Sequence, residues 1–226
     1  MRLTVFNGSP RGEESTTTIL LKHFLEGFIT TDGNTYEIAY LNRVKDGDKF
    51  IKFFQEAERV FLAFPLYDDA MPAIVKTFIE SLEPLCGRAS NPSIGFLVQS
   101  GFPEAIHSQY VERYLKKLAR RLSCKYLGTV IKGSANRIEE QPGWMTKKIF
   151  KSFYELGKTF GETGKFDDRI VLKLAKPEKL RAFQLWILRL VLKTPLANLN
   201  WNKLLKENDA YEKRFKKPYM EVKNGF

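Results

Sequence analysis

The start of the chain decides the fold, because a strand, a polar loop and a helix follow one another where residues 3–28 read LTVFNGSPRGEESTTTILLKHFLEGF. The apolar run Leu3–Phe6 predicts a short buried strand, which the turn-forming residues 7–10 end. Over Thr16–Phe28 the apolar residues recur at helical spacing, which predicts an amphipathic helix. A strand followed by a helix is the unit from which parallel sheets are built.

The same alternation of strand and helix continues along the chain. The further predicted strands are Thr35–Leu41, Val60–Phe64, Ile94–Val98 and Tyr126–Ile131. The further predicted helices are Asp48–Ala57, one opening at Pro72, Ile106–Leu122 and Thr146–Phe160. In the fourth helix of the chain we expect Tyr110, Tyr114, Leu118 and Leu122 to form the apolar side. This order predicts an α/β fold with a parallel sheet and helices on both faces.

The pattern changes near Gly161–Lys165, so we expect a domain at 1–164 and a helical extension at 165–226. In the extension, a helix is expected from Pro177 until Pro195 interrupts it. Two shorter helices are expected at Asn198–Lys206 and Tyr211–Phe215. The extension is too small and discontinuous for an independent domain. We expect it to pack on the domain or on a second subunit.

The positive charge lies mainly in this extension. The formal net charge of the chain is +11, and residues 173–226 hold 13 Lys and Arg against 5 Asp and Glu. Such a basic segment suits nucleic acid, an anionic membrane surface or an acidic partner. A solvated helical surface explains the same charge and is the interpretation that we favour. We therefore expect no nucleic-acid partner.

The sequence gives no support for a metal site, a disulfide framework or a membrane-spanning segment. Cys86 and Cys124 lie far apart without metal spacing, and His23 and His107 are the only histidines. Both thiols are expected to be reduced. No secretory signal is visible, and the apolar run Leu185–Leu188 is far shorter than the roughly 20 residues of a membrane span. We expect a cytoplasmic protein with no stable membrane insertion.

Ligands of open parallel sheets bind beyond the carboxyl ends of the strands, so the loops there are the candidate sites. The loop Asn7–Thr17 offers hydroxyls, the Arg11 guanidinium and backbone amides at a helix N-terminus, a combination that suits a phosphate. An ordinary helix cap at Ser15 or Thr16 is the alternative. Neither a P-loop nor the Gly-x-Gly-x-x-Gly pattern is present. Since Glu13 and Glu14 would repel a phosphate, both must point outward.

Two further loops reach the same predicted edge. Residues 64–72 bring aromatic, apolar and thioether side chains, which suit a wall for a flat ring. The alternative is that Tyr67 and Met71 pack into the core. In the loop 99–104, Gly101 permits close approach of a ligand to the backbone. A plain strand–helix turn would look the same.

These loops resemble those of a known family. The segment Val5–Arg11 with Ser15 and Thr16 is similar to the phosphate loop of the flavodoxin-like NAD(P)H-dependent FMN reductases and quinone reductases. The segment 65–73, followed by Lys76, Phe78 and Ile79, resembles the second flavin loop of that family. Residues 100–104 resemble its third. The resemblance covers about residues 1–160 in order.

The resemblance implies a flavodoxin-like three-layer sandwich with a five-stranded sheet in the order 2-1-3-4-5. It also implies FMN as cofactor, NAD(P)H as co-substrate and a homodimer. The implied phosphate ligands are Ser9, Arg11, Ser15, Thr16 and Thr17. The implied lining of the isoalloxazine is Pro65, Leu66, Tyr67, Asp68 and Met71, with Ser100, Gly101, Phe102 and Glu104 along its other edge.

The implied function is transfer of hydride from NAD(P)H through bound flavin to a quinone-like or other small-molecule electron acceptor. The flavin carries the chemistry in such enzymes, so no catalytic residue is expected. One alternative is a flavodoxin-type electron carrier. Those carriers are typically acidic, and a net charge of +11 would oppose docking on the same partners. A second alternative is a non-enzymatic binding protein that uses its basic tail.

Overall fold

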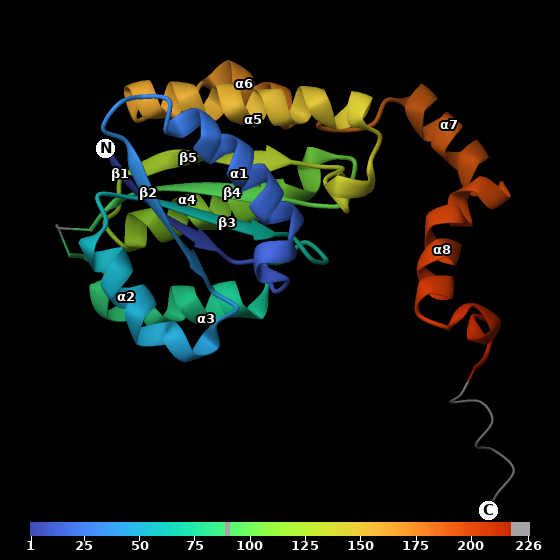
Figure 1. Ribbon diagram of the computed structural model, residues 1–226, viewed down its shortest axis with the longest axis horizontal. Helices are drawn as coiled ribbons and strands as arrows, with labels where there is room; N and C mark the ends of the chain where they lie inside the picture. The colour runs from blue at the N-terminus through green and yellow to red at the C-terminus, as the bar shows by residue number, and fades with distance from the viewer. Residues whose placement is uncertain (89–90, 218–226) are drawn as a thin grey trace, which may run out of the picture. The chain divides into compact units, whose positions relative to one another are not determined.

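The computed structural model describes residues 1–88 and 91–217 and contains a parallel sheet (Figure 1). Its strands are β1 (Arg2–Asn7), β2 (Thr35–Tyr40), β3 (Arg59–Pro65), β4 (Ser93–Gln99) and β5 (Tyr126–Lys132). The sheet has 5 strands in the order β2-β1-β3-β4-β5, and all neighbouring pairs are parallel. This confirms the predicted sheet and its order.

Helices cover both faces of the sheet and complete a three-layer sandwich (Figure 1). On one face lie α1 (Thr16–Phe28) and α5 (Gly143–Thr163). On the other lie α2 (Gly47–Glu56), α3 (Ala73–Ser81) and α4 (Gln109–Arg121). The predicted three-layer architecture is therefore confirmed.

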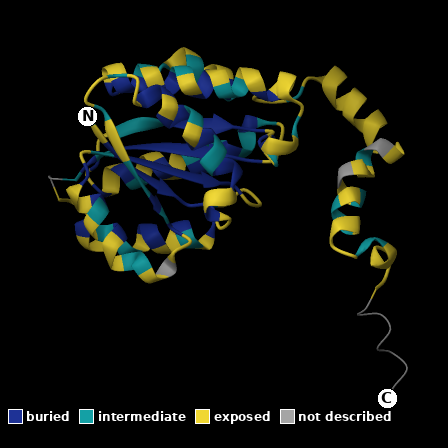
Figure 2. Ribbon diagram, viewed as in Figure 1, coloured by how far each residue is buried: buried dark blue, intermediate teal, exposed yellow. Residues whose placement is uncertain are grey.

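The core consists of two apolar layers, because successive side chains of a strand point to opposite faces. Val5 packs toward α1 and α5, whereas its neighbour Phe6 packs toward α2 and α3. Figure 2 shows β1, β3 and β4 almost wholly buried between exposed helix surfaces, whereas the edge strand β2 is mostly exposed or half-buried. Burial on both faces explains why the three inner strands read as near-continuous apolar runs.

The predicted apolar side of α4 is correct at Leu118 and Leu122, which pack in the core, and wrong at the two tyrosines. Within the helix the buried residues are Val111, Leu115 and Ala119, while Tyr110 is 73% exposed and Tyr114 is 45% exposed. Both stripes have helical spacing, and they differ by a rotation of about one residue. The aliphatic stripe is buried because it has no polar atom that needs a partner, whereas each tyrosine hydroxyl keeps its contact with water.

The segment after α5 also differs from expectation. Helix α6 (Asp168–Leu174) was not predicted; it is capped by Asp167, whose side chain accepts from the amides of Arg169 and Ile170. No helix begins at Pro177. The carbonyls of Pro177 and Glu178 instead accept from the amides of Ala105 and Ile106, at 3.0 and 3.2 Å. Carbonyls used in this way are not available to start a helical turn.

The chain divides into two compact units, Met1–Lys179 and Leu180–Phe226. The first unit includes residues 165–179, which the sequence pattern places in the extension, because α6 packs on α5 and β5. The second unit holds α7 (Ala182–Leu192), α8 (Leu199–Glu207) and the short 3₁₀ helices η6 (Pro195–Asn198) and η7 (Tyr211–Lys213). The helix predicted at Tyr211–Phe215 is instead a single 3₁₀ turn over Tyr211–Lys213. Among the described residues, no helix combines the length and the apolar composition that crossing a membrane requires.

Candidate functional site

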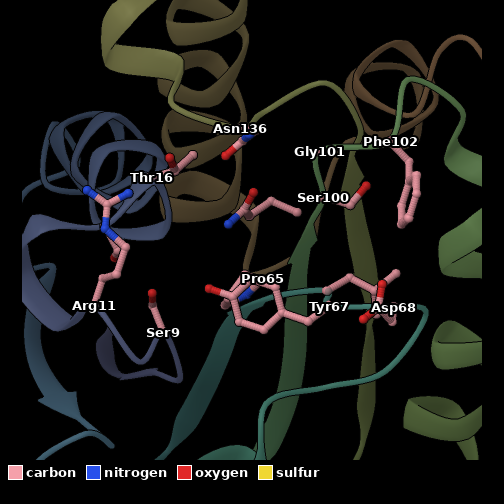
Figure 3. A pocket seen from close by; sticks show the side chains of 13 residues that line it. Ser9, Arg11, Thr16, Pro65, Tyr67, Asp68, Ser100, Gly101, Phe102 and Asn136 are labelled. Carbon is pink, nitrogen blue, oxygen red and sulfur yellow. The ribbon is translucent and has the colours of Figure 1, made fainter. Parts of the chain in front are cut away.

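A cleft of about 490 Å³ opens at the carboxyl edge of the sheet, where the loops after β1, β3, β4 and β5 meet (Figure 3). The strand order reverses between β1 and β3, so the connections after them leave to opposite faces and open a crevice. The volume lies within the range of about 300–1,000 Å³ typical of small-molecule sites. The three loops singled out in the sequence therefore meet at one place.

Most of the predicted site residues line this cleft. They are Ser9, Arg11, Ser15, Thr16, Pro65, Leu66, Tyr67, Asp68, Ser100, Gly101 and Phe102. Three predicted residues are absent from its lining, namely Thr17, Met71 and Glu104. Two lining residues were not predicted, namely Gln99 and Asn136.

The first wall of the cleft is the N-terminus of α1, and Ser15 caps it. The Ser15 hydroxyl accepts from the Thr18 amide at 3.2 Å and donates to the Gly12 carbonyl at 2.7 Å. The first amides of a helix have no acceptor within the helix, and the cap serves only that of Thr18. The amides of Thr16 and Thr17 thus remain at the positive end of the helix dipole. This is the geometry of an anion site.

Gly12 sets the path of this loop. Its φ of +56° lies in the left-handed region, and its amide donates to the Ser9 carbonyl at 2.9 Å. A Cβ at this position would lie 2.4 Å from Nδ2 of Asn42. Glycine is required here by backbone conformation and by close packing together.

Acidic side chains next to the α1 N-terminus divide into two groups. Glu13 is exposed and pairs with Arg43 at 2.6 Å, and Glu14 is also exposed, so both point away from the cleft as predicted. Glu139 was not anticipated. Its carboxylate accepts from the Thr16 hydroxyl at 3.4 Å and lies 3.8 Å from Nη2 of Arg11. No local pattern reveals a partner that lies 123 residues from Thr16.

The second wall is a tight turn after β3. The amides of Tyr67 and Ala70 donate to each other's carbonyls at 2.9 Å, and Asp68 and Asp69 have φ angles of +45° and +63°. Positive φ at both central residues defines a type I′ turn, and aspartate tolerates that conformation better than most residues. The turn holds Tyr67 and Asp68 at the cleft (Figure 3).

Two side chains of this segment behave differently. Met71 packs against the apolar layer formed with α2 and α3, so the core interpretation is correct for it. Tyr67 lines the cleft with half of its surface exposed, so the core interpretation is wrong for it.

The third wall follows β4 and is held by backbone hydrogen bonds to the loop after β5. The amides of Ala135 and Ser134 donate to the carbonyls of Ser100 and Phe102, both at 2.8 Å. The Ser100 hydroxyl is buried in this wall and has no hydrogen-bond partner within the described part of the chain. A buried polar atom without a partner is costly. It therefore indicates a place where a ligand atom would complete the hydrogen bonding.

The remaining predicted residues support the walls without lining them. Thr17 is fully buried, and its hydroxyl accepts from Nε2 of Gln99 at 3.4 Å. Glu104 lies 3.7 Å from Nε2 of His107. The position of Gln99 and Asn136 in the sequence could have indicated them. Gln99 is the last residue of β4, and Asn136 lies in the loop after β5, so both are at the carboxyl edge of the sheet.

Comparison with known proteins gives structural neighbours only. No protein-family model and no curated protein matches the sequence. The structure is similar to an FMN-dependent NADH-azoreductase from Bacillus anthracis in complex with FMN, with a TM-score of 0.56, 14% identity, and coverage of 71% of this chain and 100% of that chain. It is also similar to an NAD(P)H:quinone oxidoreductase from Methanothermobacter marburgensis, with a TM-score of 0.57, 15% identity, and coverage of 71% and 96%.

A third neighbour, an apo NADH:FMN oxidoreductase, has a TM-score of 0.52 and 14% identity, and the match covers 81% of this chain and 92% of that one. These neighbours are members of the enzyme classes that the sequence resemblance suggested. At such low identity they establish architecture. The chain has the flavodoxin-like α/β fold.

Proposed function

We propose that this protein is an NAD(P)H-dependent flavin oxidoreductase that binds FMN in the cleft and passes hydride to a quinone-like or other small-molecule acceptor. The observation that carries the proposal is the meeting of three features in one cleft: a helix N-terminus, a type I′ turn and a buried hydroxyl that has no partner among the described residues. FMN has a phosphate, a flat ring and polar ring edges. Each wall of the cleft suits one of these parts.

The residues of the first wall fit the phosphate. Arg11 supplies a guanidinium, Thr16 and Ser9 supply hydroxyls, and the first amides of α1 point to the same region. Ser15 contributes by fixing the helix cap, because the Gly12 carbonyl and the Thr18 amide already occupy its hydroxyl. Thr17 would contribute its backbone amide, since its side chain is buried.

The other two walls fit the ring. Residues 65–68 would contact one edge through backbone groups, and residues 100–102 would contact the other. The Ser100 hydroxyl would find its missing partner on a polar ring edge. Bound FMN would supply the hydride chemistry, while the chain binds, orients and excludes water. Tyr67, half exposed at the cleft, is the residue we propose to donate a hydrogen bond to an acceptor oxygen.

Two finer parts of the proposal concern assembly and location. Within its own unit α7 buries none of its residues, and its exposed apolar side chains include Phe183, Trp186 and Leu192. Exposed apolar surface of this kind marks interaction sites, which supports a homodimer. The two unpaired thiols, Cys86 and Cys124, support a reducing compartment such as the cytoplasm. A monomeric mass by light scattering would contradict the dimer.

The first experiment is the visible absorbance spectrum of the purified protein after FMN is added and the excess is removed. We expect a protein-perturbed flavin spectrum that NADH or NADPH bleaches in the absence of oxygen. The matched variants are Arg11→Ala at the cleft and Arg43→Ala, whose guanidinium pairs with Glu13 outside it. Charge-assisted hydrogen bonds contribute about 1.5–3 kcal/mol, so Arg11→Ala should weaken FMN at least tenfold and riboflavin little. Arg43→Ala should change neither.

Steady-state turnover separates the enzyme from an electron carrier. An oxidoreductase consumes NAD(P)H continuously when a quinone is supplied, whereas a carrier stops once its own flavin is reduced. The net charge of +11 supports the enzyme, because carriers dock on basic reductases through acidic surfaces. A protein that retains neither FMN nor riboflavin would overturn the proposal and favour a binding role for the basic segment.

A further inference from the structure

A carboxylate of this chain, that of Glu139, lies beside the N-terminus of α1. Glu139 lies in the 3₁₀ helix η5 (Ile138–Glu140), after β5. One oxygen, Oε2, accepts from the Thr16 hydroxyl at 3.4 Å, and the other, Oε1, lies 3.8 Å from Nη2 of Arg11. Thr16 and Arg11 are two of the three side chains that we assign to the ligand phosphate. The carboxylate therefore occupies contacts that a phosphate oxygen would make.

Hydrogen bonds from Gln141 hold the segment that carries Glu139. The Gln141 side-chain amide donates to the carbonyls of Ser134 and Asn136, at 3.0 and 3.2 Å. Asn136 itself lines the cleft, and the preceding amides of this loop bond to the wall at 100–102. Glu139 is thus carried to the α1 N-terminus by a loop that is part of the same site. Its side chain is 34% exposed, so it can turn toward solvent.

The Glu139 carboxylate and a ligand phosphate cannot both bind to Arg11 and Thr16 at the same time. A phosphate monoester carries about −1.5 to −2 charges at neutral pH, and like charges in contact repel. The positive end of one helix and one guanidinium favour a single anion. Entry of a ligand phosphate therefore requires that Glu139 leave Arg11 and Thr16.

We propose that Glu139 is an internal competitor for the phosphate subsite. It thereby sets how strongly the protein prefers FMN, which carries the phosphate, over riboflavin, which lacks it. The inference rests on the proposed function, since it assumes that the phosphate of the flavin binds at α1. The competitor is a specificity-determining residue that acts on the phosphate alone. It should leave binding of the ring unchanged.

The test compares three ligands with three proteins: FMN, riboflavin and inorganic phosphate, with the wild type, Glu139→Gln and Glu13→Gln. Glutamine keeps the size and an acceptor for Thr16 while removing the charge. A partly exposed ion pair is worth up to about 1 kcal/mol, so Glu139→Gln should bind FMN about fivefold more tightly. Riboflavin affinity should not change. Glu13→Gln removes the same charge from the same loop, but Glu13 pairs with Arg43 outside the cleft. It should behave as the wild type.

Inorganic phosphate gives a readout that does not depend on flavin. Phosphate should raise the melting temperature of Glu139→Gln more than that of the wild type, because at equal concentration a ligand of the folded state stabilises it more when it binds more tightly. Unchanged or weaker FMN binding by Glu139→Gln would overturn the inference. An equal gain for Glu13→Gln would also overturn it, since the effect would then be a general change of charge.

Failure of the proposed function has a different signature. If no protein binds FMN or riboflavin, but phosphate still stabilises Glu139→Gln more than the wild type, the proposed function fails and the competition stands. If FMN binds and neither the FMN affinity nor the phosphate response depends on residue 139, the inference fails and the proposed function stands. Absence of both responses overturns both.

Discussion

The imidazole of His107 stacks on the ring of Phe102, with 4.5 Å between the ring centroids and 26° between the planes. The same imidazole places Nδ1 3.3 Å from the Asp69 carboxylate and Nε2 3.7 Å from that of Glu104. Asp69 belongs to the turn that forms the second wall of the cleft, and Phe102 belongs to the third. One side chain therefore connects the two walls between which we place the flavin ring.

Replacing His107 by alanine should loosen both walls. Aromatic stacking is worth about 1 kcal/mol, so His107→Ala should weaken riboflavin and FMN alike by about fivefold. Affinity can be followed by quenching of flavin fluorescence. The matched control is His23→Ala, because His23 stacks on Phe150 at 4.3 Å and pairs with Glu26 at 3.0 Å outside the cleft lining. Equal losses in the two variants would contradict the role of His107.

Removal of the Ser100 hydroxyl should affect the free and the bound protein in opposite ways. Burying a polar group without a partner costs about 1–3 kcal/mol, so Ser100→Ala should leave the free protein as stable or more stable. Flavin affinity should fall about fivefold, as expected for loss of one hydrogen bond of about 1 kcal/mol. Melting curves and binding titrations measure the two effects.

Ser108 offers the control for this experiment. Its hydroxyl is also buried without a partner in the described residues, and it does not line the cleft. Ser108→Ala should therefore show the same effect on stability and none on flavin affinity. A Ser100→Ala variant that binds flavin as well as the wild type would show that the ligand does not reach this hydroxyl.

Gly157 should be essential for the packing of α5 on α1. A Cβ at this position would lie 1.8 Å from the Phe24 carbonyl oxygen, so the two helices would have to move apart. Overpacking of this kind costs about 1–3 kcal/mol, so Gly157→Ala should lower the free energy of unfolding by that amount. Urea denaturation measures the change. Gly143→Ala is the control in the same helix, because no atom of the described residues lies within 4 Å of the added Cβ. Its effect should stay within about 0.5 kcal/mol.

The two cysteines should differ in reactivity. Burial raises the pKa of the Cys124 thiol to about 12, and the nucleophile in alkylation is the thiolate. Cys86 is exposed. Near neutral pH a maleimide should label one thiol per chain in the folded protein and two in urea, as counted by mass spectrometry. A folded Cys86→Ser variant that is still labelled would contradict the burial of Cys124.

Lys132 should lower the stability of the protein at neutral pH. It is 7% exposed, burial lowers its pKa, and its ammonium donates to the Gly133 carbonyl at 2.6 Å. Between the lowered folded pKa and the ordinary value near 10.5, the unfolded chain binds more protons than the folded one. The penalty is therefore complete below the folded pKa and disappears as the pH rises through this window.

The variant Lys132→Met tests this dependence on pH. Its advantage in unfolding free energy over the wild type should be largest at neutral pH and should shrink under alkaline conditions. Lys158→Met, at an exposed position of α5, is the control and should show no such trend. A constant difference between Lys132→Met and the wild type across this range would contradict the prediction.

The order of the strands and helices along the chain follows from local sequence patterns alone. Apolar runs such as Val60–Phe64 and the helical spacing over Thr16–Phe28 are local patterns, and each reports how one segment is buried. Because parallel strands end at one edge of a sheet, this order was also enough to bring three loops to the same cleft. The Ser15 cap is local in the same sense, since Ser15 and Thr18 lie three residues apart.

Which side chains meet depends on the tertiary structure. Two stripes of α4 had helical spacing, and contact with the sheet selected Val111 and Leu115 over the tyrosines. Met71 and Tyr67 belong to one loop, yet the first packs into the core and the second lines the cleft. Glu139 reaches Thr16, and His107 reaches Asp69, across distances in sequence that carry no periodic signal. Such pairings depend on strand order and on the paths of the connections, so the charge and hydrogen bonding of the site follow from the folded chain.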